Sequence, residues 1–296
     1  MNSPLFSIVI PTYNRANEIG RCISSVVNQT YSNWEAIVVD NYSQDNTQEI
    51  VNSFNDKRIR YFKNHNYGII SVSRNFGLDK SNGMWICFLD SDDWWMPNKL
   101  ESLMPYIDEY DIIYHGFKTN AKRTRLFQRT NNMFYSIKEP TVQYVLQRGD
   151  PLSPSCTAVN MSFIGNCRFS EDKDLFAIED YDFFLQLLLK HPRIKHLKKY
   201  LANYDITTGV SHNAIAHCTR SRRLYSKYKQ YLTNEEFRNV LKLYMSIKGR
   251  AYYETNPTLA RYYFKITASS SIPEIRYASF YNVLKTYILQ ILNWIK

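Results

Sequence analysis

Short apolar runs recur along the first half of the chain, and two of them end in an aspartate. Runs of this kind predict buried strands. Their positions are residues 6–10, 34–40, 59–62, 84–90 and 111–117. The segments between the first four runs predict helices, and the first of these segments repeats apolar residues at helical spacing. The predicted helices cover residues 18–28, 45–54 and 71–80. The alternation of strands and helices predicts an α/β fold with a doubly wound, mostly parallel sheet.

The pattern changes in the second half of the chain. Residues 153–163 predict a strand-rich segment, and residues 180–189 predict a helix with one apolar side. Residues 118–129 are basic and polar, which indicates an exposed loop or an edge hairpin. After about Ser211 the composition shifts to basic, tyrosine-rich segments with helical spacing. We therefore place a domain boundary there, with an α/β domain at residues 1–210 and a helical C-terminal region at residues 211–296.

A cluster of acids directly follows the strand predicted at residues 84–90. Asp90, Asp92 and Asp93 stand together around Ser91. Side chains at the carboxyl end of such a strand line the crevice where ligands bind, and crowded carboxylates favour a bound cation. Their hard oxygen atoms suit Mg²⁺ or Mn²⁺, which is typically held by one or two carboxylates plus substrate phosphates. The alternative is an acidic turn in which Asp93 caps the next helix.

The bulk composition narrows the class of protein and its partners. The chain has 296 residues and a net charge of +10, which favours an anionic partner: a nucleotide, a nucleic acid or a membrane surface. Its 5 cysteines have no zinc-binding spacing and suit the reduced thiols of a cytosolic protein. We find no secretory signal and no run of roughly 18 apolar residues, so a cytoplasmic location is expected.

Five segments carry a resemblance to a known family. The first four are SIVIPTYNR, WEAIVVDNYSQDNT, YGIISVSRNFGLDKSNG and ICFLDSDDWWMPNKL, and AIEDYDFFLQL follows them. In this order they resemble the family 2 glycosyltransferases, over about residues 5–210. The resemblance implies the GT-A nucleotide-sugar-binding fold and an inverting, metal-dependent sugar transfer. It also implies a role in building a bacterial surface polysaccharide or glycolipid.

The resemblance assigns the first two strand ends to the nucleotide. Thr12 and Tyr13 would contact the base and ribose, and Arg15 would reach the diphosphate. Asp40 closes the second strand, where the family usually has two adjacent acids. Here Asn41 stands in the second place, and its carbonyl can accept a hydrogen bond from uracil without the assistance of a charge. A UDP-sugar is therefore the expected donor, although this departure weakens the assignment of the base.

The same resemblance assigns the metal and the diphosphate. Asp90-Ser91-Asp92 matches the family's DxD motif, in which Asp92 would bind Mn²⁺ or Mg²⁺ directly. Asp90 would bind the metal or its water, or contact the ribose together with Ser91. Such a cation stabilises the departing nucleoside diphosphate as a Lewis acid. Arg74 would pair with a donor phosphate or with the carboxylates of the cluster, and the alternative is a purely structural ion pair.

Asp180 is the expected catalytic base, because inverting members of the family use an acid there to deprotonate the acceptor hydroxyl. The alternative is that Asp180 caps the helix that begins there. Glu179 and Asp182 would orient the acceptor or the loop. His212 ends the segment YDITTGVSH, and it either approaches the metal and diphosphate or lies on the surface.

The acceptor and the C-terminal region leave alternatives open. Trp94, Trp95, Tyr114 and His115 either stack on an acceptor sugar or belong to the core. Residues 278–296 form an apolar stripe at helical spacing. It either packs on the protein's own helices or a second copy of the chain, or lies on a membrane that carries a lipid-linked saccharide acceptor. If the stripe lies on a membrane, we expect the protein to associate peripherally with the inner face of that membrane.

Two other function classes fit the sequence less well. A nucleotidyltransferase would need a glycine-rich phosphate loop after the first strand, and PTYNRANEIG offers none. A basic nucleic-acid-binding protein would need aromatic and basic residues interleaved on one face. We therefore expect a nucleotide sugar and a saccharide as partners, and no nucleic acid.

Overall fold

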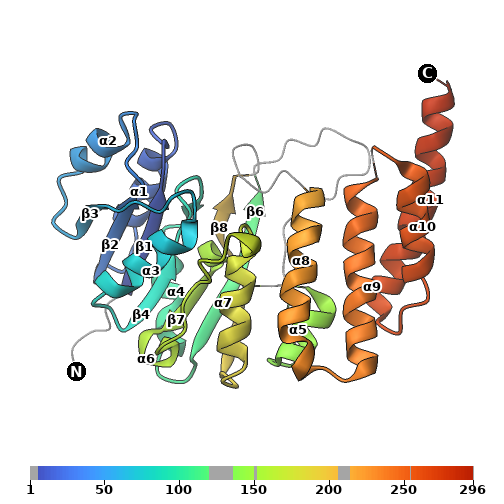
Figure 1. The fold of residues 1–296 in the computed structure, drawn as a ribbon. Coiled ribbons are helices and arrows are strands. Elements are labelled where there is room, and N and C mark those ends of the chain that lie inside the picture. The colour runs from blue at the N-terminus through green and yellow to red at the C-terminus, as the bar shows by residue number, and fades with distance from the viewer. Residues whose placement is uncertain (1–5, 120–135, 150–151, 206–213, 254, 296) are drawn as a thin grey trace. The chain divides into compact units, whose positions relative to one another are not determined.

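The structure is a computed structural model that describes residues 6–119, 136–149, 152–205, 214–253 and 255–295 (Figure 1). The chain divides into two compact units. The first comprises Met1–Pro140 with Pro151–Gly209, and the second comprises Thr141–Asp150 with Val210–Lys296. The short segment Thr141–Asp150 thus belongs to the second unit, although it precedes residue 210 in the chain.

The first unit is built on a mixed sheet whose described strands follow the order β3-β2-β1-β4-β7-β6-β8-β5. Its first half consists of parallel strands joined by helices, as the apolar pattern predicts. These strands are β1 (Phe6–Thr12), β2 (Trp34–Asp40), β3 (Ile59–Lys63) and β4 (Trp85–Phe88). The connecting helices are α1 (Ile19–Val27), α2 (Thr47–Ser53) and α3 (Ile70–Lys80). The α/β fold class predicted from the sequence is confirmed.

The second half of the sheet is less regular. Strand β7 is antiparallel to both β4 and β6, whereas β6 and β8 are parallel to each other and β5 is antiparallel to β8. The strands are β5 (Trp94–Trp95), β6 (Ile112–Thr119), β7 (Thr157–Asn160) and β8 (Ile194–Tyr204). The helices of this half are α4 (Lys99–Leu103), α6 (Met161–Ile164) and α7 (Glu179–Leu188), with 3₁₀ turns η1 (Met104–Tyr106), η2 (Pro154–Cys156) and η3 (Lys173–Leu175).

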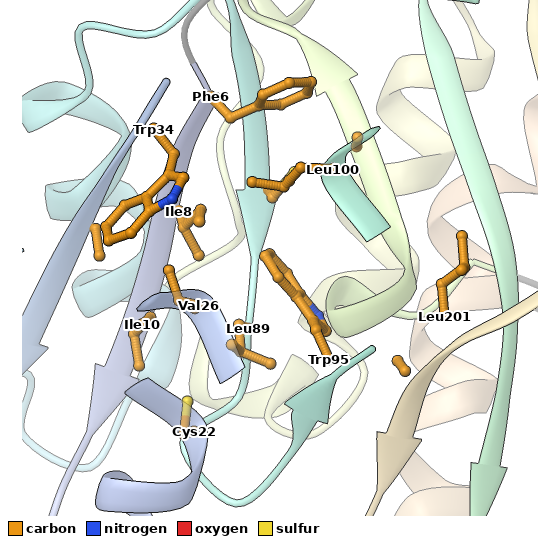
Figure 2. Packing of buried hydrophobic residues seen from close by; sticks show 14 of the residues in the cluster. Phe6, Ile8, Ile10, Cys22, Val26, Trp34, Leu89, Trp95, Leu100 and Leu201 are labelled. Carbon is orange, nitrogen blue, oxygen red and sulfur yellow. The ribbon is translucent and has the colours of Figure 1, made fainter. Parts of the chain in front are cut away.

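Two hydrophobic clusters lie on opposite faces of this sheet. Ile8 and Ile10 of β1 belong to one cluster and Val9 to the other, because successive side chains of a strand point to opposite faces. Figure 2 shows the first cluster, in which Trp95 and Leu89 are buried with them. Burial of Trp95 favours its interpretation as a core residue over sugar stacking.

Helix α3 approaches the sheet closely at Gly77. The helix packs against β1 and β2, and a Cβ atom at Gly77 would lie 2.3 Å from Cγ1 of Val9. Atoms cannot approach so closely without displacement, so only glycine fits this position in the observed geometry. The close packing fixes the height of α3, and with it Arg74, above the sheet.

The regular elements described in the second unit are all helices or 3₁₀ turns. Its helices are α5 (Val142–Arg148), α8 (Ala214–Tyr228), α9 (Asn234–Ala251), α10 (Pro257–Thr267) and α11 (Pro273–Ile295), with a 3₁₀ turn η5 (Lys229–Tyr231). Thr233 and Glu236 form a capping box at the start of α9. Among the described helices, none is both long enough and apolar enough to cross a membrane.

Candidate active site

The loop that follows β1 is fastened to the loop that follows β2. Asn14 donates its backbone N–H to Ser43 Oγ (2.8 Å), and Arg15 donates its own to Thr47 Oγ1 (2.9 Å). Asn14 has a φ of 49°, a conformation that asparagine adopts more readily than most residues. This turn leaves the side chain of Tyr13 exposed at the end of β1, where the resemblance places the base of the donor.

Thr12 and Asp40 end their strands side by side and are both buried. Asp40 accepts hydrogen bonds from the backbone N–H (3.0 Å) and the hydroxyl (2.6 Å) of Ser43, and from the Tyr61 hydroxyl. Burial and the neighbouring Asp40 raise the pKa of Tyr61, which keeps its phenol protonated as a donor. The carboxylate of Asp40 therefore ties the loop after β2 to the neighbouring strand β3. Among the described residues, Thr12 Oγ1 has no hydrogen-bond partner.

Asn41 also ties neighbouring loops to one another. Its Oδ1 accepts the backbone N–H of Asn66 (2.9 Å), and its own N–H donates to the carbonyl of Thr12 (3.0 Å). Both residues of the Asp40-Asn41 pair thus have structural partners in addition to the nucleotide contact predicted for them. That contact itself stays a prediction.

The acidic loop after β4 is closed by a turn and is largely buried. The N–H of Asp93 donates to the carbonyl of Asp90 (2.9 Å), and Arg15 Nη2 lies 3.3 Å from Asp92 Oδ2. Burial and the charge of Asp90 raise the pKa values of both Asp92 and Asp93. Ser91, predicted to contact the donor, has a buried side chain. The carboxylates of this loop are thus crowded enough to disfavour one another's ionisation, as the sequence predicts.

Arg21 and Asp205 hold this loop from one side, and neither was predicted from the sequence. Arg21 Nη2 donates to the carbonyl of Asp92 (2.8 Å) and to Asp205 Oδ2 (2.9 Å), and its guanidinium lies 3.8 Å from the ring centroid of Trp94. The backbone N–H of Asp205 donates in turn to Asp93 Oδ1 (3.0 Å). These residues are far apart in the sequence, so no local signal connects them.

Ser155 and Lys99 support the same loop from the interior. Ser155 Oγ accepts the backbone N–H of Asp90 (3.2 Å), and the Ser155 carbonyl accepts from Lys99 Nζ (3.0 Å) and Trp95 Nε1 (2.9 Å). Lys99 is fully buried, and Nζ lies 3.3 Å from the ring centroid of Trp95. Burial lowers the pKa of Lys99 to about 8.

Arg74 joins the acidic loop to the start of α7. Its Nη1 lies 2.8 Å from Glu179 Oε1 and its Nη2 lies 2.9 Å from Asp90 Oδ1, while its side chain is almost completely buried. The coulombic effect of Asp90, Glu179 and Asp180 keeps the pKa of Arg74 above its ordinary value despite burial. Of the roles predicted for Arg74, the structure shows the pairing with a carboxylate of the cluster.

Asp180 lies in the first turn of α7, next to Glu179. The residue that caps this helix is Ile178, so Asp180 is not the cap, although its Oδ1 accepts the backbone N–H of Tyr181 (2.8 Å). Burial and the charge of Glu179 raise the pKa of Asp180 to about 7, against the opposing influence of Arg74. A carboxylate with such a pKa is suited to accept a proton near neutral pH.

The acidic loop fits a cation that a bound substrate helps to hold. No three His, Cys, Asp or Glu side chains within the described part of the chain are arranged as a metal site. The predicted ligand His212 lies outside the described residues. Asp90 and Asp92 nevertheless lie close enough for one to raise the pKa of the other, a repulsion that a cation would relieve. Two carboxylates plus substrate phosphates are a usual ligand set for Mg²⁺.

Other predicted positions fall outside this constellation. Tyr114 and His115 are buried, and burial together with the nearby Lys99 lowers the pKa of His115. Asp182 is buried within α7, where Gln186 donates to its Oδ2 (3.0 Å). The structure brings together two arginines and four acids: Arg15 and Arg74, Asp90 and Asp92 in the acidic loop, and Glu179 and Asp180 on α7.

Comparisons with known proteins agree with this architecture. Residues 7–165 match the family model described as glycosyl transferase family 2. The Escherichia coli K12 WcaA glycosyl transferase, named for colanic acid biosynthesis, is 31% identical over 64% of this chain and 68% of its own length. E. coli WfgD is named a UDP-Glc:α-D-GlcNAc-diphosphoundecaprenol β-1,3-glucosyltransferase. It is 46% identical over 34% of this chain and 40% of its own length. The match with this chain thus covers less than half the length of WfgD.

A solved structure extends the comparison to nearly the whole chain. S. aureus TarS residues 1–349, crystallised with UDP-GlcNAc, superimposes with a TM-score of 0.65. The match covers 95% of this chain and 89% of the TarS chain at 19% sequence identity. At this identity the likeness shows a shared fold.

Proposed function

The chain belongs to glycosyl transferase family 2, and we propose that it is an inverting, metal-dependent glycosyltransferase. Its donor is a nucleotide diphosphate sugar, expected to be a UDP-sugar, and its acceptor is a saccharide or lipid-linked saccharide hydroxyl. The observation that carries the proposal is one ion-paired assembly. It connects Arg74, the acidic loop and the first turn of α7, where Asp180 has a raised pKa.

The relatives favour the choice of donor and acceptor. The name of WfgD specifies a UDP-sugar donor and a lipid-linked acceptor, and TarS was crystallised with a UDP-sugar. The name of WcaA refers to polysaccharide biosynthesis. We therefore place the proposed reaction in the synthesis of a surface polysaccharide or glycolipid.

The two arginines differ in what they offer a diphosphate. Arg15 is partly exposed and has its ion pair with Asp92 at a distance of 3.3 Å, so its side chain can turn towards a phosphate. Arg74 is buried between Asp90 and Glu179, and it acts by holding the acidic loop and α7 at a fixed separation. Mn²⁺ or Mg²⁺ held by Asp92 and Asp90 would supply Lewis-acid stabilisation of the leaving diphosphate.

Asp180 acts as the general base in this proposal. The acceptor oxygen forms a bond to the anomeric carbon as the bond from that carbon to the diphosphate breaks. The hydroxyl proton passes to the Asp180 carboxylate. A single displacement of this kind inverts the anomeric configuration and needs one base.

The assignment of Asp92 is tested by Asp92→Ala. We expect turnover to be abolished and Mn²⁺-dependent binding of UDP to weaken sharply in calorimetry, with the thermal midpoint preserved. Asp79→Ala is the matched control, because Asp79 is an exposed aspartate in an ion pair with Arg168 away from the acidic loop. Unchanged metal-dependent UDP affinity in Asp92→Ala would remove Asp92 from the site. A screen of nucleotide sugars for Mn²⁺-dependent release of nucleoside diphosphate identifies the donor.

A further inference from the structure

Helix α11 has an unusual distribution of polar and apolar side chains. The side that packs within the second unit carries small hydroxyls: Ser279 is bonded to Thr267 (2.7 Å between oxygens), and Thr286 Oγ1 accepts from Arg261 Nε (3.2 Å). Both Ser279 and Thr286 are fully buried. A helix that served only to complete a core would place its large apolar side chains on this side.

Ile275, near the start of α11, packs in a small core cluster, but most of the large apolar side chains described for α11 are exposed. Spacings of three and four residues place them on one face of the helix. They are Tyr277 (66% exposed), Phe280 (59%), Tyr281 (54%), Leu284 (60%) and Ile288 (37%), and we call this set the α11 stripe. A contiguous apolar surface of this kind marks an interaction site.

Cations border the α11 stripe. The Arg276 guanidinium lies 5.4 Å from the ring centroid of Tyr277, and Lys285 Nζ lies 4.6 Å from that of Tyr281. On the neighbouring α10, the Arg261 guanidinium lies 3.7 Å from the ring centroid of Tyr287. Apolar residues flanked by tyrosine rings and by basic side chains are the composition of a helix that lies in a membrane interface.

The distribution of charge along the chain indicates the sign of the partner. Residues 211–296 contain 14 Lys and Arg but 4 Asp and Glu, so this region has a net charge of +10. Residues 1–210 contain 23 of each kind, so the whole net charge of the chain lies in the C-terminal region. The partner of the α11 stripe should therefore combine an apolar phase with negative charge.

An anionic bilayer combines an apolar phase with negative charge, whereas a second copy of the chain would offer only the apolar surface. A symmetric dimer through the α11 stripe would bring two copies of the same basic border to one interface without supplying negative charge. A nucleic acid would engage the cations but leave Phe280, Leu284 and Ile288 in water.

We propose that the α11 stripe docks the protein on an anionic membrane, with its apolar side chains at the boundary of headgroups and acyl chains. The bordering lysine and arginines lie among the headgroups. In placing a lipid-linked acceptor at that surface, the proposal rests on the proposed function, but the docking itself can be measured without any sugar.

The test is sedimentation of the full chain with vesicles, either of phosphatidylcholine alone or with phosphatidylglycerol added. We expect sedimentation with the anionic vesicles, and weakening as salt screens the basic residues. The double variant Phe280→Gln/Leu284→Gln should reduce vesicle binding at least ~10-fold, since each buried methylene contributes to such binding. Met84→Gln is the matched control, because Met84 is an equally exposed apolar side chain in the first unit (58%).

Light scattering, thermal midpoints and UDP binding of the same samples separate the remaining outcomes. Preserved folding, mass and UDP binding in the double variant, with lost vesicle binding, supports the proposal. The proposal is overturned if the wild-type chain does not sediment with anionic vesicles. It is also overturned if the wild-type chain is a dimer that becomes a monomer in the double variant. Equal vesicle binding by wild type and double variant would also overturn it, since the cations alone would then be sufficient. Vesicle binding and oligomeric mass are measured without any sugar transfer, so a failed sugar-transfer assay would count against the proposed function and not against membrane docking.

Discussion

At the scale of single residues, the proposed function depends most directly on the ionisation of Asp180. Asp180→Asn retains the size of the side chain but cannot accept the acceptor's proton. We expect UDP binding near that of wild type, and a rate at least ~10²-fold lower in a sugar-transfer assay. A base must be deprotonated, so the wild-type rate should fall as the pH drops through about 7, the raised pKa of Asp180. An acidic limb near the ordinary aspartate pKa, or wild-type turnover in Asp180→Asn, would exclude Asp180 as the base.

Lys99 offers a prediction in which activity falls while stability at pH 7 does not. Lys99→Met keeps most of the packing and removes a fully buried cation, so the free energy of unfolding at pH 7 should not fall. The Ser155 carbonyl loses one of its two donors, and Ser155 holds the N–H of Asp90. We expect turnover to fall roughly 10–100-fold, as for other residues that orient a site indirectly.

The pH dependence of stability provides an independent readout of Lys99. The folded protein releases this proton near pH 8, whereas the unfolded chain binds it up to its ordinary pKa of 10.5. Wild-type stability should therefore rise between those values, and Lys99→Met should lack that rise. Lys190→Met is the control, because Lys190 also contacts an aromatic ring and a backbone carbonyl, but on the surface. Equal losses of activity in the two variants would show that Lys99 has no special role.

The candidate site was predictable only where its residues form local patterns. Asp90, Asp92 and Arg74 stand in motifs at strand ends or on the helix between them. Arg21 and Asp205 instead meet through the tertiary fold, and Arg21 is an ordinary surface-type residue of an amphipathic helix. The hydrogen bond from Tyr61 to Asp40 could not be predicted from the sequence either, because it depends on the pairing of β2 with β3.

At the scale of elements, two glycines of similar appearance should respond oppositely to alanine. Gly77→Ala places a methyl group 2.3 Å from Val9 Cγ1 and should cost about 1–3 kcal/mol, the usual range for overpacking. Gly20→Ala, in α1, meets its nearest atom at an ordinary 3.5 Å and should gain up to about 1 kcal/mol from helix propensity. Urea denaturation measures both. Gly77→Ala/Val9→Ala should recover part of the loss, and no recovery would show that Val9 is not the cause.

The elements missed from the sequence lack a clear period. Strand β8 carries Lys195, Lys198 and Lys199, and its pairing with β6 shifts register around Gly116, which breaks the alternation of buried and exposed residues. Strand β5 covers only Trp94–Trp95, too short for any pattern. Helix α3 was predicted from the sequence, although it has no clear apolar side, because its polar residues Ser71, Ser73 and Arg74 are buried as well.

At the scale of the whole molecule, the proposed donor site and the net positive charge lie in different parts of the chain. The net charge of +10 favours an anionic partner, but residues 1–210 contain equal numbers of acidic and basic residues. Local groups such as Arg15, and not the overall charge, should therefore determine nucleotide affinity.

This separation can be measured with charge-neutralising variants. Arg222→Gln/Arg223→Gln/Lys227→Gln changes three exposed cations of α8 and should leave the Kd for UDP unchanged even at low salt. Arg15→Gln removes one charge beside Asp92 and should weaken UDP binding in the same calorimetric assay. A larger effect from the triple variant would mean that long-range attraction dominates donor binding.

The position of the antiparallel strand β7 late in the chain affects how the sheet can form during synthesis on the ribosome. Strands β1 to β4 can pair as soon as Phe88 has emerged, but the free edge of β4 waits for Thr157–Asn160. An unpaired edge is a template for pairing with another chain. Ser155, Glu179 and Asp180 emerge at or after that same stage. The nascent chain thus closes the free edge of β4 shortly before Glu179 and Asp180 emerge, so neither protection of that edge nor a complete candidate site precedes the last third of the first unit.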